Sequence, residues 1–89
     1  MSDAFWHIKQ KYIATFPQKR QDLKHAWDCK DVVSLRALLH KLAGSSGGYG
    51  FNDLHTLCHQ SMELLEEYNS QNDPLIDGLM TKILDELVQ

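Results

Sequence analysis

Apolar residues recur every three to four positions along most of the chain, and this period constrains the fold more than any other feature. The clearest case is the segment from Leu75 to Val88, whose apolar stripe continues for about four turns. No run alternates with a period of two, and no Asn-Gly pair marks a hairpin. Helices with one apolar stripe bury it against one another. The sequence therefore predicts an all-α fold, an antiparallel four-helix bundle with an additional short N-terminal helix.

The first two helices of this prediction are short. One runs from Asp3 to about Ala14, and the next runs roughly from Pro17 to Cys29. Between them, Thr15 and Gln18 fit a capping box, in which the threonine caps the amides ahead and the glutamine reaches back. The apolar positions of the first segment are Phe5, Ile8, Tyr12 and Phe16, with Trp6 and Ile13 on a flank.

Three further helices follow. Asp31 is the expected N-cap of the third, which local propensity ends near Gly44. The fourth runs from about Asn52 to Tyr68. Asp73 is the expected N-cap of the last, which we expect to be the long packing helix of the bundle. The apolar stripe of the fourth helix contains Leu54, Leu57, Cys58, Ser61, Met62, Leu65 and Tyr68.

Length and composition limit the class of protein. The 89 residues form a single helical domain, residues 1–89, with room for one modest core. No apolar run approaches the roughly 20 residues that span a bilayer, and no signal peptide begins the chain, so we expect a cytoplasmic protein without membrane contact. The formal net charge of −3 argues against nucleic-acid binding. Cys29 and Cys58 are isolated, so we expect neither a disulfide framework nor a cysteine-rich zinc site.

His40 lies opposite the apolar stripe of the third helix, among small side chains. At about 100° per residue, its neighbours on this face are Val33, Arg36, Ala37, Ala43, Gly44 and Gly47. If the helix continues, Gly44, Gly47 and Gly48 each cost about 1 kcal/mol relative to alanine. Small residues beside a nucleophilic imidazole suit close docking of a large partner. The alternative is an ordinary surface histidine followed by a glycine-rich helix terminus.

Charge is distributed unevenly along the chain. Residues 1–41 contain eight Lys/Arg and four Asp/Glu, whereas residues 42–89 contain one Lys and eight Asp/Glu. His40 lies at the end of the basic half. A basic surface there would attract an anionic pocket or a phosphoryl group.

The run from His40 to Ser46, HKLAGSS, is followed from Leu54 by the pattern L-x-x-L-C-x-x-x-M-E. Together they resemble the signature of histidine phosphotransfer (HPt) domains, and the resemblance covers nearly the whole chain. The matching positions outside these runs are Phe16, Pro17, Leu23, Asp31, Leu35 and Gly50. Where the family usually has a basic residue three positions after the histidine, this chain has Ala43. Lys41 and Arg36 are the candidates to supply that charge.

The resemblance implies a phosphoryl carrier in a two-component phosphorelay, not an enzyme. His40 would accept a phosphoryl group from a receiver-domain aspartate and pass it to another receiver. The residues implied to lie near the phosphoryl group or the receiver are Arg36, Ala37, Lys41, Ala43, Gly44 and Gly47. The resemblance also implies that the third helix continues about one turn beyond Gly44.

The implied partners are response-regulator receiver domains and a hybrid sensor histidine kinase. The receiver supplies Mg²⁺, so we expect no cofactor and no metal site on this chain, which we expect to be a monomer. Met1 and a last helix that reaches Gln89 favour a free-standing protein.

Two other functions remain open. One is a helical interaction module, in which His40 is incidental and the exposed clearing binds a partner helix. The other is a metal-binding bundle that uses His55 and His59, whose i, i+4 spacing can chelate a transition metal.

Overall fold

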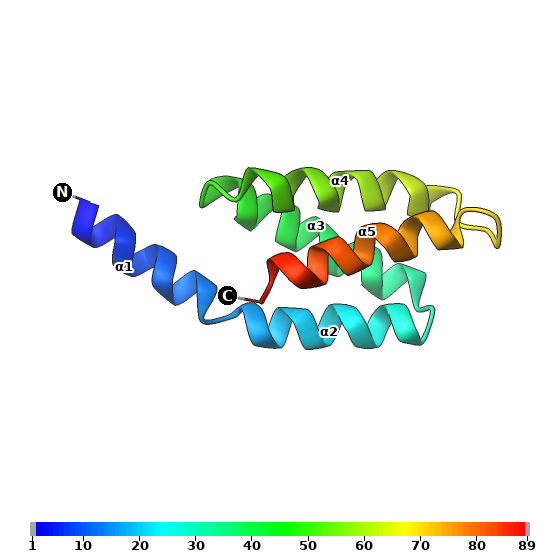
Figure 1. Ribbon diagram of the computed structural model, residues 1–89, viewed down its shortest axis with the longest axis horizontal. Helices are drawn as coiled ribbons and strands as arrows, with labels where there is room; N and C mark the ends of the chain where they lie inside the picture. Colours follow the sequence, from blue (N-terminus) through cyan, green and yellow to red (C-terminus); the bar gives the residue numbers. More distant parts are fainter. Residues whose placement is uncertain (1, 89) are drawn as a thin grey trace.

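The computed structural model describes residues 2–88, which form helices joined by short turns (Figure 1). The five helices are α1 (Ser2–Ile13), α2 (Phe16–Asp28), α3 (Val32–Gly48), α4 (Asn52–Glu66) and α5 (Asp73–Glu86). Helices α2 to α5 lie side by side with alternating direction, and α1 extends away from one end of the bundle. The predicted all-α bundle with an additional N-terminal helix is therefore confirmed. Within the described residues, no helix combines the length and the apolar character that crossing a bilayer requires.

The core lies where the apolar faces of α2 to α5 meet. Helix α3 packs against both α2 and α4, and α5 closes the bundle by packing against α4 and α2. The buried side chains come from positions three and four apart on each helix, as the apolar period predicts. The largest of those that are completely buried are Phe16, Leu23, Leu35, Leu39, Leu54, Cys58, Ile76, Met80, Ile83 and Leu87.

Helix α1 buries only the end of its apolar stripe. Tyr12 is buried, as is Phe16 at the start of α2, but Phe5, Trp6 and Ile8 are 52%, 56% and 49% exposed. These three residues have the predicted helical spacing. They stay exposed because α1 projects beyond the bundle (Figure 1), and among residues 2–88 no other helix packs along this part of α1.

Two of the predicted helix caps differ from the structure. Thr15 precedes α2, but its side chain does not cap the helix. Its hydroxyl donates to the carbonyl of Tyr12 at 2.6 Å. The side-chain amide of Gln18 donates to the carboxylate of Asp22 at 2.8 Å. The capping box is therefore wrong, because a turn of only two residues places the threonine hydroxyl against the last turn of α1.

The start of α5 is also displaced by one residue. Its N-cap is Asn72, whose side-chain amide donates to the carbonyl of Leu64 at 3.1 Å. Asp73 instead accepts from the Tyr68 hydroxyl at 2.7 Å. Helix α4 ends at Glu66, two residues before the predicted Tyr68. Helix α5, with 14 residues, is shorter than α3 with 17 and α4 with 15, so it is not the long helix of the bundle.

Both ends of α3 agree with the prediction. Asp31 is the N-cap, and its side chain accepts from the amide of Ser34 at 3.2 Å. The helix continues through Gly44 to Gly48, the longer of the two expected ends. Two residues after this end lies Gly50, whose φ of +83° suits glycine. The amide of Phe51 then donates to the carbonyl of Ser46 and that of Gly50 to Gly47, at 2.9 and 3.2 Å, which is a Schellman motif.

Candidate functional site

His40 lies in the middle of α3 with its side chain exposed. Leu39 and Leu42 are buried on the other side of the helix, as predicted. Ala37 and Gly44, three positions before and four after the histidine, are exposed on the same outward face. A Cβ placed on Gly44 would meet no heavy atom of the described residues within 4 Å. The imidazole therefore stands on an open helix face where two of its neighbours, Ala37 and Gly44, have almost no side chain.

Ala43 does not lie in this clearing, contrary to the prediction. Its side chain is only 3% exposed and belongs to the core. The reason is its direction on the helix, which differs from that of His40 by about 60° and turns it toward α4. Ala43 thus contributes neither charge nor open space beside His40.

Gly47 is exposed, but its missing side chain makes room for a residue of α4. A Cβ at this position would lie 2.9 Å from Nδ1 of His55. That nitrogen lies 2.7 Å from the carbonyl oxygen of Ala43. Because a carbonyl only accepts hydrogen bonds, Nδ1 carries the hydrogen and donates it. The glycine thus permits a direct hydrogen bond between α3 and α4, and nothing in the sequence pattern had pointed to it.

The two candidate cations occupy different surroundings. Arg36 donates to Glu66 of α4 at 3.1 Å, in an ion pair whose side chains are both about half exposed. Lys41 is exposed and forms no hydrogen bond or ion pair with the described residues. Arg36 is therefore engaged across the α3–α4 interface, and Lys41 is available to an incoming anion.

A groove between α2 and α3 lies on the Lys41 side of the site. It has two adjoining hollows, and Asp22, Leu38 and Lys41 line both of them. One of the two hollows is also lined by Tyr12 of α1, whose hydroxyl lies 2.6 Å from that of Ser45. Burial raises the pKa of the Tyr12 hydroxyl, and the hydrogen bond between Tyr12 and Ser45 opposes this rise. The Tyr12 ring also stacks on Tyr49 at 4.2 Å, so α1 is fastened to the C-terminal end of α3.

His55 and His59 lie close together, with ring centroids 4.5 Å apart in an edge-to-face arrangement. However, Nδ1 of His55 is occupied by its hydrogen bond to Ala43. Within residues 2–88, no group of three or more histidine, cysteine or carboxylate side chains is arranged to hold a metal ion. The two histidines thus lack a third protein ligand in the part of the chain that the structure describes.

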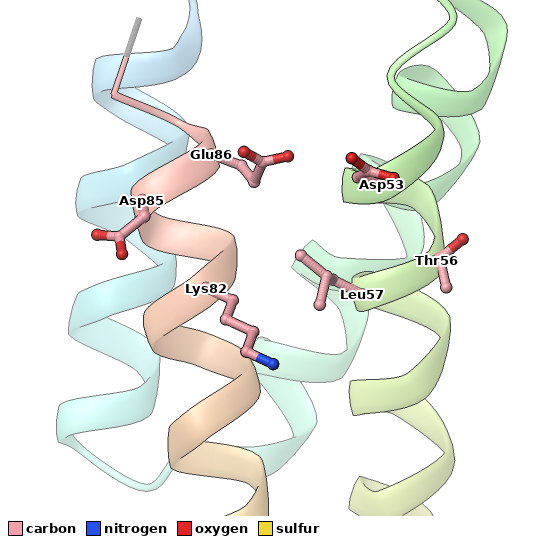
Figure 2. A pocket seen from close by; sticks show the side chains of 6 residues that line it. All are labelled: Asp53, Thr56, Leu57, Lys82, Asp85 and Glu86. Atoms are coloured by element: carbon pink, nitrogen blue, oxygen red, sulfur yellow. The ribbon is translucent and has the colours of Figure 1, made fainter.

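Some of the positive charges in the first half of the chain form ion pairs with negative charges in the second half. Lys30 pairs with Asp73 at 3.3 Å and Arg36 pairs with Glu66, so both ion pairs join the basic half to the acidic half. A separate hollow between α4 and α5 is lined by three acidic residues, Asp53, Asp85 and Glu86, together with Thr56, Leu57 and Lys82 (Figure 2). Asp53 and Glu86 face one another across it. This acidic surface belongs to helices other than the one that carries His40.

The family model of the Hpt domain matches residues 7–89. The matched range contains His40 and all four helices of the bundle. Comparisons with curated proteins and with solved structures give no match.

Proposed function

Because the chain belongs to the Hpt domain family, whose members carry phosphoryl groups, we propose that His40 is its phosphoryl acceptor. The chain would take a phosphoryl group from a receiver-domain aspartate and pass it to a second receiver in a multistep phosphorelay. The observation that carries this proposal is the exposed imidazole of His40, flanked on its helix face by Ala37 and Gly44. A folded receiver can approach such a face closely.

In the forward step, a lone pair on one ring nitrogen of neutral His40 attacks the phosphorus of an aspartyl phosphate. The N–P bond forms while the bond from phosphorus to the aspartate oxygen breaks, and the electron pair returns to the carboxylate. The other ring nitrogen then releases its proton to solvent. Transfer to the next receiver follows the same path in reverse.

The chain contributes position and charge to this exchange. The face around His40 lets the attacking nitrogen and the aspartate oxygen reach an in-line arrangement across the phosphorus. Lys41, which has no partner among the described residues, would offset the charge of the phosphoryl group. The receiver would supply Mg²⁺ and the acidic pocket. We therefore propose a carrier without a cofactor or hydrolytic machinery of its own, acting as a cytoplasmic monomer.

The proposed partners are response-regulator receiver domains and a hybrid sensor histidine kinase. Their identity can be approached by incubating the chain with phosphorylated receivers and Mg²⁺. Label should appear on the wild-type chain and be absent from His40→Gln. It should be labile in acid and stable in alkali, as expected for phosphohistidine. His55→Gln is the matched control and should still accept label.

Label on the His40→Gln variant would move the acceptor elsewhere. Failure of every receiver tested to label the wild-type chain would favour the alternative, a helical interaction module. The exposed Phe5, Trp6 and Ile8 would then be the first surface to examine for a partner.

A further inference from the structure

Two contacts define how α3 and α4 are aligned. Arg36 of α3 pairs with Glu66 of α4, and the carbonyl of Ala43 accepts from His55. Since the helices run in opposite directions, the residues between 36 and 43 lie opposite those between 66 and 55 (Figure 1). His40 lies near the middle of the first interval. It is therefore level with the middle of the second, close to residues 59–62.

Only some residues of α4 point toward α3 at this level. His55 and Glu66 contact α3, so they mark the flank of α4 that faces it. Helical spacing places His59 and Met62, four and seven positions after His55, on the same flank. Met62 is buried in the core, whereas His59 is exposed. His59 is thus an exposed side chain that α4 presents at the level of His40.

The ring of His59 is also held by a neighbour. It packs edge to face against His55, and the hydrogen bond to Ala43 anchors that imidazole to α3. The orientation of His59 therefore depends on the same contact that aligns the two helices.

A phosphoryl group on His40 would add roughly two negative charges and three acceptor oxygens to this face. On the α2 side, Lys41 is available to it. On the α4 side, Arg36 is paired with Glu66, and Glu63 is an exposed carboxylate that cannot donate. The ring N–H of His59 is a donor at that side that takes part in no other hydrogen bond among the described residues.

We propose that His59 is a phosphoryl-binding residue, whose ring N–H donates to an oxygen of the phosphoryl group on His40. The inference rests on the proposed function and adds to it a second imidazole, supplied by α4. Hydrogen bonds to charged oxygens are stronger than those between neutral groups, so His59 would prolong the life of the phosphorylated chain.

The test uses the full chain and needs no receiver. Phosphoramidate transfers its phosphoryl group to histidine, forming a ring N–P bond as its own P–N bond breaks and ammonia leaves. After the reagent is removed, fragment mass spectrometry follows the phosphate on His40 with time. The variants are His59→Leu, which keeps bulk without a donor, and His59→Gln, which keeps an N–H. His7→Leu, an exposed histidine of α1, is the matched control.

Loss of one hydrogen bond corresponds to roughly a two- to ten-fold effect, so the half-life on His40 should fall about three-fold or more in His59→Leu. It should stay near the wild-type value in His59→Gln and His7→Leu. Circular dichroism on each variant checks that the helices are retained.

Equal half-lives in the wild type and His59→Leu would overturn the inference. Equal shortening in the leucine and glutamine variants would do the same, since the N–H would then not be the cause. So would phosphate that appears on His59 but not on His40. Failure of the relay itself looks different. His40 would then hold phosphate in a His59-dependent way but exchange it with no receiver.

Discussion

The Nδ1 atom of His55 donates a hydrogen bond of 2.7 Å to the carbonyl of Ala43, joining α4 to the helix that carries His40. Gly47 leaves the space that the imidazole occupies. The small residues after His40 therefore have separate roles. Gly47 serves the contact between helices, whereas Gly44 faces open space on the outward side of α3.

This division predicts different effects of alanine on the stability of the bundle. Gly44→Ala and Gly48→Ala add a methyl group in open space and should each raise the free energy of unfolding by about 0.5–1 kcal/mol. Gly47→Ala gains the same helix propensity, but its Cβ would displace His55 and cost the hydrogen bond, about 0.5–1.5 kcal/mol. We expect Gly47→Ala to be no more stable than wild type. Urea unfolding of the three variants measures this order, and equal gains in all three would contradict it.

A bulky side chain at Gly44 should slow phosphotransfer while leaving the fold intact. Gly44→Gln would place side-chain atoms one turn from His40, where they obstruct the approach of a receiver. Misplacement of about 1 Å is enough to lower such a rate substantially, so we expect a loss of at least about ten-fold. The measurement is the rate of labelling by a phosphorylated receiver.

The matched control for this obstruction is Gly78→Gln. Gly78 is also an exposed glycine within a helix and has open space around it, but it lies in α5. This variant should be labelled at the wild-type rate. An unchanged rate in Gly44→Gln would reject the docking surface that we propose.

The two cations beside His40 should contribute unequally to transfer. Lys41→Gln removes a charge that has no partner among the described residues, and we expect labelling to slow several-fold. Arg36→Gln breaks the exposed pair with Glu66, which is worth about 1 kcal/mol or less, and should affect transfer less. Comparing the salt dependence of both rates provides a second readout, because the loss in Lys41→Gln should shrink as salt increases. A larger effect from Arg36→Gln would assign the missing basic group to Arg36 instead.

The period of apolar residues was sufficient to predict the four packed helices, because burial on a helix follows local spacing. It did not establish where α3 ends. Local propensity stops that helix near Gly44, since each glycine costs about 1 kcal/mol, but packing against α2 and α4 outweighs this cost. The resemblance to the HPt family contained that information, and the composition did not.

Contacts between helices were beyond the reach of the sequence pattern. The hydrogen bond from His55 to Ala43 depends on the rotation and register of two helices, which a periodic pattern leaves open. The same rotation buries Ala43, which a helical wheel drawn for α3 alone had placed beside His40. Trp6 shows the converse. Its spacing suits burial, but no helix of the bundle lies opposite it.

The two cysteines should differ sharply in reactivity. Cys58 is fully buried, and burial raises the pKa of its thiol to about 12, so it should resist alkylation in the folded protein. Cys29 is exposed at the end of α2 and should react. Iodoacetamide should add one group to the native chain and two in denaturant, as measured by intact mass. Cys29→Ser should add none when folded. Rapid alkylation of Cys58 in the native variant would show that the core opens near α4.

Acid should destabilise the bundle through Asp73. The hydrogen bond from Tyr68, together with the Lys30 ammonium, lowers the pKa of the Asp73 carboxyl below its usual range. A carboxyl whose pKa is lower in the folded state stabilises that state above its unfolded pKa of about 4, and the contribution is lost as the pH falls through the folded value. The N-terminal end of α5 favours the same negative charge.

Urea midpoints measured between about pH 6 and pH 2.5 should therefore fall less steeply in Asp73→Asn than in the wild type. The two curves should converge at the acid end, because protonated Asp73 resembles asparagine there. Parallel curves across the whole range would mean that Asp73 makes no pH-dependent contribution to stability.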